Sequence, residues 1–129
     1  MSDERDPDYD QQAPVDVEGA ESVHDSATKS FLAMLNDPRM PNGVMAAITE
    51  CSIIMNQRKE HGLAKYGVVL HKDNGRDSFR DLIEELSDAV AYSIVLQQQG
   101  KVGNRLVGMV MGVMIAAVYS RDNDETEIG

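Results

Sequence analysis

The sequence predicts an all-α domain, a four-helix bundle-like arrangement, and three observations lead to this expectation. The 129-residue chain has the length of one domain. It contains no Trp and only 5% aromatic residues, so aliphatic side chains and eight Met must form its core. Met, Leu and Ala lose little side-chain freedom in a helix. Finally, apolar residues recur at helical spacing in four segments that turn residues separate.

The two ends of the chain are acidic, whereas the middle is nearly neutral. Residues 1–26 carry nine acids against one Arg, and residues 121–129 carry four acids against one Arg. Charged segments with few large apolar side chains are typical of disorder. We therefore predict disordered acidic tails at 1–26 and 121–129 around an all-α domain at 27–120. The first tail has two interpretations, a solubilising segment or an acidic arm that docks on a basic partner.

The composition also restricts the partners and the compartment. A near-neutral body lacks the clustered basic surface of nucleic-acid binding proteins, so no nucleic acid partner is expected. Cys51 is the only cysteine, which excludes an intramolecular disulfide and a Cys-based zinc site. The three His (His24, His61, His71) lack zinc-ligand spacing. The N-terminus has no basic and apolar signal segment, so a cytoplasmic location is expected.

The first two helices are bounded by cap and turn residues. Ser26 is a candidate N-cap for a short helix over 27–36, which Asp37-Pro38 ends. The turn Pro41-Asn42-Gly43 precedes a second helix from about Val44 to His61, and Gly62 is its expected stop. Residues 62–76 then form a long loop between helices two and three. Loops of this length are usually functional or mobile.

The last two helices differ in their charge. The third begins with Asp77 or Ser78 as its N-cap and ends at Gln97-Gln98-Gln99-Gly100. The fourth runs from Gly103 or Asn104 to Tyr119 and has no charge between Leu106 and Ser120. This stretch is shorter than the ~20 residues of a membrane span, so no membrane partner is expected. A single small subunit buries such a helix with difficulty. We therefore expect a homodimer or homotetramer through the helix Gly103–Tyr119, where Gly108 and Gly112 permit close approach.

An acidic stripe on the third helix is the main candidate for chemistry. Asp81, Glu85, Asp88 and Tyr92 share one face at about 100° per residue, with Glu84 beside them. One interpretation is a solvated face. The other is a Mg²⁺ site, because clustered carboxylate oxygens suit a hard cation. The apolar Val95 and Leu96 follow on the same side, and four cations (Lys65, Lys72, Arg76, Arg80) surround the loop, which favours a triphosphate site.

Three stretches carry a resemblance to a known family. Residues 58–67, 74–77 and 81–92, and above all Glu84-Glu85-Leu86-Ser87-Asp88, resemble the MazG-like all-α nucleoside triphosphate pyrophosphohydrolases, particularly short phage-encoded members. The resemblance implies a Mg²⁺-dependent cleavage between the α and β phosphates of an NTP or dNTP. It also implies dimers or tetramers and, for a phage-encoded member, the host cytoplasm. The implied catalytic residues are Glu50, Glu85 and Asp88, the metal ligands Glu50, Glu84, Glu85 and Asp88, and the substrate-binding residues Lys65, Tyr66, Asn74, Arg76 and Arg80.

One position departs from the family pattern of a Glu-x-x-Glu helix followed by a Glu-x-x-Asp helix. Glu50 matches the first Glu, but Ile53 stands where its companion is expected. The carboxylate set is therefore incomplete. Three functions remain open: the pyrophosphohydrolase, a non-catalytic protein on the same scaffold that sequesters a nucleotide or a nucleotide-derived signal, and a phage regulatory module that binds another protein.

Overall fold

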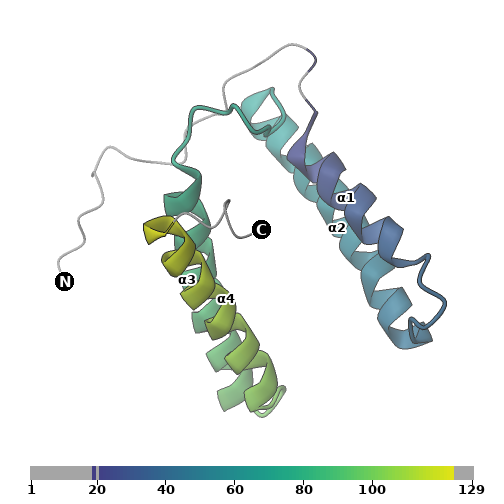
Figure 1. Cartoon of the computed structure of the whole chain (residues 1–129), viewed down its shortest axis with the longest axis vertical. Helices are drawn as coiled ribbons and strands as arrows, with labels where there is room; N and C mark the ends of the chain where they lie inside the picture. Colours follow the sequence, from purple (N-terminus) through teal and green to yellow (C-terminus); the bar gives the residue numbers. More distant parts are fainter. Residues whose placement is uncertain (1–18, 20, 124–129) are drawn as a thin grey trace. The chain divides into compact units, whose positions relative to one another are not determined.

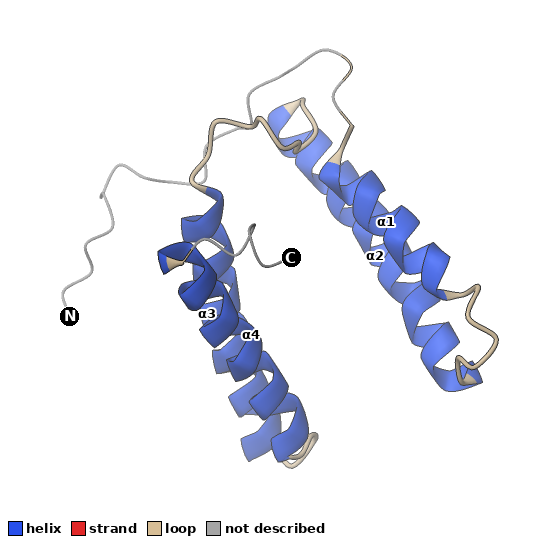
Figure 2. Cartoon of the chain, in the orientation of Figure 1, coloured by secondary structure: helices blue, strands red, loops and turns tan. Residues whose placement is uncertain are grey.

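The computed structural model describes residues 19 and 21–123, and these form four α-helices and no β-strand (Figures 1 and 2). The prediction of an all-α chain with four helices is confirmed. The helices belong to two units, residues 1–76 and 77–129, each of which contains one helical hairpin. Of the tails predicted at 1–26 and 121–129, residues 1–18, 20 and 124–129 lie outside the described residues, whereas residues 23–26 and 121–122 are helical.

The first hairpin pairs α1 (Val23–Met34) with α2 (Asn42–Tyr66). The prediction that Ser26 caps a helix over 27–36 is wrong, because α1 begins three residues before Ser26. Ser22 is the N-cap, and its Oγ accepts hydrogen bonds from the N–H groups of His24 and Asp25 at 3.1 and 3.4 Å. Ser26 lies inside the helix, where its hydroxyl donates to the Ser22 carbonyl. A non-local hydrogen bond from Val23 N to Leu70 O, 2.8 Å long, holds the first turn in place.

The second helix is longer than the sequence indicated. We expected Gly62 to end it near His61, but α2 continues for 25 residues to Tyr66. Gly67 is its C-cap, with a φ of 75°, and the Gly67 N–H donates to the Leu63 carbonyl at 2.8 Å. The helix ends at Gly67 because this glycine adopts the left-handed backbone conformation. Gly62 keeps the right-handed helical conformation, so the helix continues through it. The predicted loop 62–76 is therefore wrong at its start, and the connection begins at Gly67.

Substituting alanine for Gly67 and for Gly62 is expected to change the free energy of unfolding in opposite directions. Gly67→Ala places a side chain in the left-handed region and should lower the free energy of unfolding by about 1 kcal/mol. Gly62→Ala should raise it by ~0.5–1 kcal/mol, because Gly62 is helical and a Cβ there meets nothing within 4 Å. Urea unfolding followed by circular dichroism measures both. Equal effects of the two substitutions would contradict the assignment of Gly67 as the cap.

The second hairpin pairs α3 (Ser78–Gln98) with α4 (Asn104–Asp122). Of the two candidate N-caps, Asp77 and Ser78, Asp77 is the cap, because its side chain accepts a hydrogen bond from Arg80 N at 3.1 Å. The predicted end is also confirmed: Gly100 has a φ of 73°, and the following residue donates its N–H to Leu96 O at 2.9 Å. The fourth helix starts after Gly103 as expected and continues one turn beyond Tyr119.

Much of the apolar surface of α4 is uncovered. Val107 and Ala117 are buried against the hairpin partner, with 7% and 8% of their surface exposed. On other sides of the helix several large apolar side chains are exposed (Leu106, Met109, Met111, Val113, Ile115, Tyr119). A hairpin partner covers only one side of a helix, so a helix that has no charge from Leu106 to Ser120 leaves apolar surface exposed in a two-helix unit. Within the described residues, no helix has the length and apolar character that crossing a membrane requires.

Candidate functional site

The acidic stripe predicted on α3 lies on one uninterrupted helix. Residues 78–98 are helical throughout, so Asp81, Glu85, Asp88 and Tyr92 project from the same side at successive turns. Ser93, about 100° around the helix from Tyr92, is buried, and α3 packs against α4. Glu85 and Asp88 are exposed, as is Tyr92 with 70% of its surface accessible. The Glu85 and Asp88 carboxylates are therefore one turn apart on an accessible surface.

Glu84, the third acid of this region, has a different surrounding. Its Oε1 lies 3.4 Å from Nε of Arg80, one turn earlier on α3, and both side chains are about three-quarters buried. The pair runs along the helix at i, i+4 spacing and stabilises it by a few tenths of a kcal/mol. Arg80 was predicted to bind substrate and Glu84 to bind metal. In this structure the two side chains bind one another.

Glu50, the fourth predicted carboxylate, lies on α2 and therefore in the first unit, whereas Glu85 and Asp88 lie in the second. It is exposed, and so is Ile53 one turn later, with 52% of its surface accessible. Over the residues that the structure describes, no three or more His, Cys, Asp or Glu side chains form a group that could hold a metal ion. Only Glu85 and Asp88 share an exposed face as predicted.

The predicted substrate-binding residues Lys65 and Tyr66 occupy the last turn of α2, because the helix continues past Gly62. The Lys65 ammonium lies 5.1 Å from the centre of the Tyr66 ring, a cation–π contact. Lys65 itself is exposed at the C-terminal end of the helix. A cation there interacts favourably with the helix dipole. The two residues therefore present one charge and one half-buried ring at the start of the loop.

The loop after Gly67 is organised by Asn74, another predicted substrate-binding residue. Asn74 is buried, its Nδ2 donates to the His71 carbonyl at 2.6 Å, and its Oδ1 accepts from Arg76 N at 2.8 Å. The side-chain amide therefore closes a local turn with both of its ends. This turn positions the exposed Lys72 and the half-buried Arg76. The contacts give Asn74 a role in shaping the loop.

His71 is the residue that sequence reasoning missed in this loop. We interpreted it as incidental, yet it has 1% of its surface exposed and is the largest fully buried side chain described. Its Nδ1 accepts a hydrogen bond from Asp73 N at 3.2 Å. The pattern His-x-x-Asn with a following Gly resembles an ordinary polar turn, and no periodicity marks its burial. Only the polar clustering of 71–76 hinted at an ordered loop.

Replacing Asn74 by alanine is expected to destabilise the first unit. The change leaves the His71 carbonyl and the Arg76 N–H without the partners that Asn74 provides, which costs about 1–3 kcal/mol. Asp73→Ala is the matched control: Asp73 is exposed and contributes its backbone N–H, which alanine retains, so the change should stay within ~0.5 kcal/mol. Chemical unfolding of both variants compares them. A larger loss for Asp73→Ala would contradict the role assigned to Asn74.

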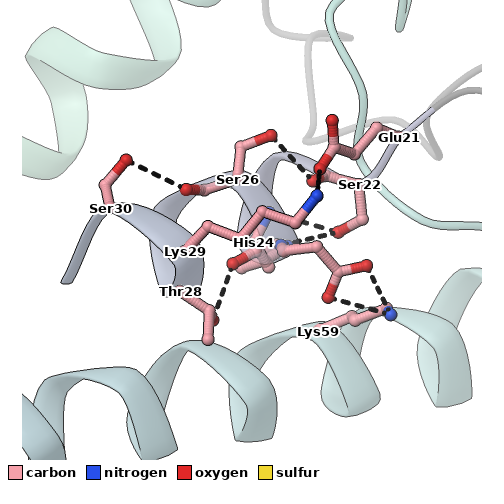
Figure 3. Close-up of polar contacts among 9 residues, drawn as sticks. Glu21, Ser22, His24, Ser26, Thr28, Lys29, Ser30 and Lys59 are labelled. Atoms are coloured by element: carbon pink, nitrogen blue, oxygen red, sulfur yellow. Dashed lines mark hydrogen bonds and ion pairs between the residues drawn. The ribbon is translucent and has the colours of Figure 1, made fainter. Parts of the chain in front are cut away.

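Polar contacts join the start of α1 to α2 (Figure 3), and a backbone hydrogen bond joins it to the loop. We call residues 22–25, Lys59 and Leu70 the α1–loop junction. Lys59 Nζ lies 3.1 and 2.8 Å from the two carboxylate oxygens of Asp25, and Val23 N donates to Leu70 O. Glu21 and Lys29 add an exposed ion pair at 2.7 Å. The sequence held a signal for this start, because Ser22 followed by Asp25 matches the capping pattern Ser/Thr-x-x-Asp/Glu.

The structure thus contains an exposed carboxylate pair on α3 and, in the other unit, an ordered loop with cations. Neither feature identifies a family by itself. Comparison of the chain with protein-family models, with curated proteins and with solved structures finds no match.

Proposed function

We propose that this protein is a Mg²⁺-dependent nucleoside triphosphate pyrophosphohydrolase, which converts an NTP or dNTP to a monophosphate and pyrophosphate. The observation that carries the proposal is the pair Glu85 and Asp88, two accessible carboxylates one turn apart on a regular helix. The sequence around this pair resembles the metal-binding helix of MazG-like enzymes. The reaction consumes one water: its oxygen bonds to the α phosphorus, and the bond from that phosphorus to the α–β bridging oxygen breaks.

The residues present fit Mg²⁺. This ion is usually held by one or two carboxylates, by water and by substrate phosphates, so the pair Glu85 and Asp88 suffices for a first attachment. When bound, the ion would polarise phosphate oxygens and lower the pKa of a water ligand. The family resemblance also implies Glu50 as a ligand. Glu84 would have to leave Arg80 before its carboxylate could contribute.

The cations of the chain would take the remaining charge of the triphosphate. Lys65 and Lys72 are exposed, and Arg76 is half-buried. A guanidinium group can bind a phosphate through two parallel hydrogen bonds. The turn closed by Asn74 positions Lys72 and Arg76 before substrate arrives. Tyr66 offers an aromatic face for the base. In this proposal the cations of the loop bind phosphate oxygens of the substrate.

We also propose that the chain self-associates as a homodimer or homotetramer through α4 and acts in the cytoplasm. The uncovered apolar surface of α4 supports the first part, since water contact with so many large aliphatic side chains is unfavourable. Gly108 and Gly112 support it as well. A Cβ at either glycine meets nothing within 4 Å, so a second helix could approach the backbone closely there.

A second candidate function follows from Ile53. Its exposed sec-butyl side chain stands one turn after Glu50, where a carboxylate would complete the ligand set. A site with too few ligands could still bind a nucleotide without hydrolysing it. In that case the protein would sequester a nucleotide or a nucleotide-derived signal.

The two candidates are separated by one set of measurements. The purified chain is incubated with each NTP and dNTP and Mg²⁺, and the products are resolved by ³¹P NMR. Monophosphate and pyrophosphate support the enzyme, whereas diphosphate and phosphate would indicate a different cleavage. Calorimetry then measures the affinity of the chain for the same nucleotides. Binding of a nucleotide without its hydrolysis supports the sequestering protein. A chain that neither binds nor hydrolyses a nucleotide would contradict both candidate functions.

A further inference from the structure

The α1–loop junction contains a histidine, His24, whose environment disfavours a positive charge. His24 follows the N-cap Ser22 by two residues, and its N–H bonds to the Ser22 hydroxyl (Figure 3). Its neighbour Val23 donates to Leu70 O at 2.8 Å, which joins the helix start to the loop. His24 is therefore the next residue after the one that bonds the loop, and its ring lies near Arg58 and Lys59 of α2.

The Nδ1 atom of His24 has no contact with solvent and no hydrogen-bond partner among the described residues. In the histidine cation both ring nitrogens carry a hydrogen. Protonation would therefore bury an N–H group without an acceptor, and such a group costs about 1–3 kcal/mol or more when charged. The neutral ring avoids this cost if its hydrogen is on Nε2.

The charged groups around the ring also disfavour a cation. Arg58 and Lys59 face it from α2, and the positive end of α1 begins at this turn. Asp25, on the same helix as His24, favours the cation and raises the pKa of His24, but both carboxylate oxygens of Asp25 are bound by Lys59. In the loop, the uncharged Leu70 carbonyl contacts the neighbouring Val23 N–H, and the buried His71 is the next residue along the chain. Burial, then Arg58, lowers the pKa of His24 below its ordinary value of 6.5.

We propose that protonation of His24 opens the α1–loop junction, so that the loop 67–76 is released from α1 in mildly acidic solution. A group whose folded-state pKa is lowered binds its proton more tightly in the open state. The junction is therefore fully closed above pH 6.5 and loses stability as the pH falls through the lowered pKa of the closed form. This inference does not depend on the proposed enzymatic activity.

Amide hydrogen exchange on the full chain tests the proposal. The protection factor of the Val23 amide reports on its hydrogen bond to Leu70 O. A protection factor is already corrected for the direct effect of pH on chemical exchange. Between pH 7.5 and 5.5 it should fall, approaching tenfold per pH unit where only the open form takes up the proton. The Gly67 amide, bonded within α2 to Leu63, is the matched control in the same unit and should keep its protection.

A variant and a titration complete the test. His24→Gln keeps a polar side chain that cannot become charged, so the Val23 protection factor should no longer depend on pH. The His24 ring signals of the wild-type chain should titrate below 6.5. A constant Val23 protection factor in the wild type, an equal fall in His24→Gln, or a ring pKa at or above 6.5 would overturn the proposal. If His24→Gln does not fold, the ring titration and the Val23-to-Gly67 comparison decide by themselves.

Discussion

Replacing Glu85 by glutamine is expected to lower nucleotide turnover by about 10²- to 10³-fold, the loss typical of removing one group that stabilises developing charge. The amide keeps the shape of the side chain and its helix propensity, so α3 should remain folded. Glutamine does not carry the charge that a Mg²⁺ ligand supplies. Release of monophosphate and pyrophosphate at saturating Mg²⁺ is the measurement, with circular dichroism to verify the helix content.

Ser87→Ala is the control for this prediction. Ser87 is exposed on the same helix between Glu85 and Asp88, but it projects from another side. Its substitution should leave turnover within about twofold of the wild type, the range expected of a surface change away from the site. Asp88→Asn should reproduce the loss seen with Glu85→Gln. Full activity in Glu85→Gln would remove α3 from the proposed site.

Replacing Gly112 by leucine is expected to weaken self-association by about tenfold or more, which corresponds to ~1.4 kcal/mol. Gly112 is helical, and a Cβ there meets nothing within 4 Å, so the added side chain should fit the single chain without strain. Leucine also favours the helix more than glycine by ~0.8 kcal/mol. The substitution therefore obstructs the approach of a second copy while the hairpin itself should become more stable.

Sedimentation over a range of protein concentrations measures this effect. Gly43→Leu is the matched control, because Gly43 is an exposed glycine in the first turn of α2 and a Cβ there also meets nothing within 4 Å. That variant should sediment as the wild type does. An unchanged oligomer in Gly112→Leu would place the interface elsewhere, and a monomeric wild-type chain would remove the proposed self-association.

The elements that were predicted correctly have local causes. Asp77 caps α3 through a bond to Arg80 N three residues later, and Gly100 ends the helix with a positive φ. Both signals lie within one turn of the boundary that they define. The spacing of Asp81, Glu85 and Asp88 likewise requires only that α3 be a regular helix. For these features the sequence pattern and the structure contain the same information.

The wrong predictions concern positions where the structure depends on a contact distant in sequence, or on which of two residues of the same type ends or caps a helix. Ser22 and Ser26 are both possible caps, and the Asp25 that follows Ser22 and the bond from Val23 N to Leu70 O together favour the earlier one. Gly62 and Gly67 are both possible stops, and only Gly67 adopts the left-handed conformation. The burial of His71 depends on the loop as a whole. In the candidate site, the acidic face of α3 could be predicted from the sequence. The ion pair of Arg80 with Glu84 and the two hydrogen bonds of the Asn74 amide could not.

The position of Ser22 sets the shortest fragment that can keep the first hairpin intact. A fragment cut after residue 26, at the predicted domain boundary, would lose the N-cap, the bond to Leu70 and the ion pair between Asp25 and Lys59. A fragment that begins at Glu21 would retain all three and the Glu21–Lys29 pair. The acidic segment and the folded chain therefore overlap by several residues, and proteolysis within that overlap would damage the fold.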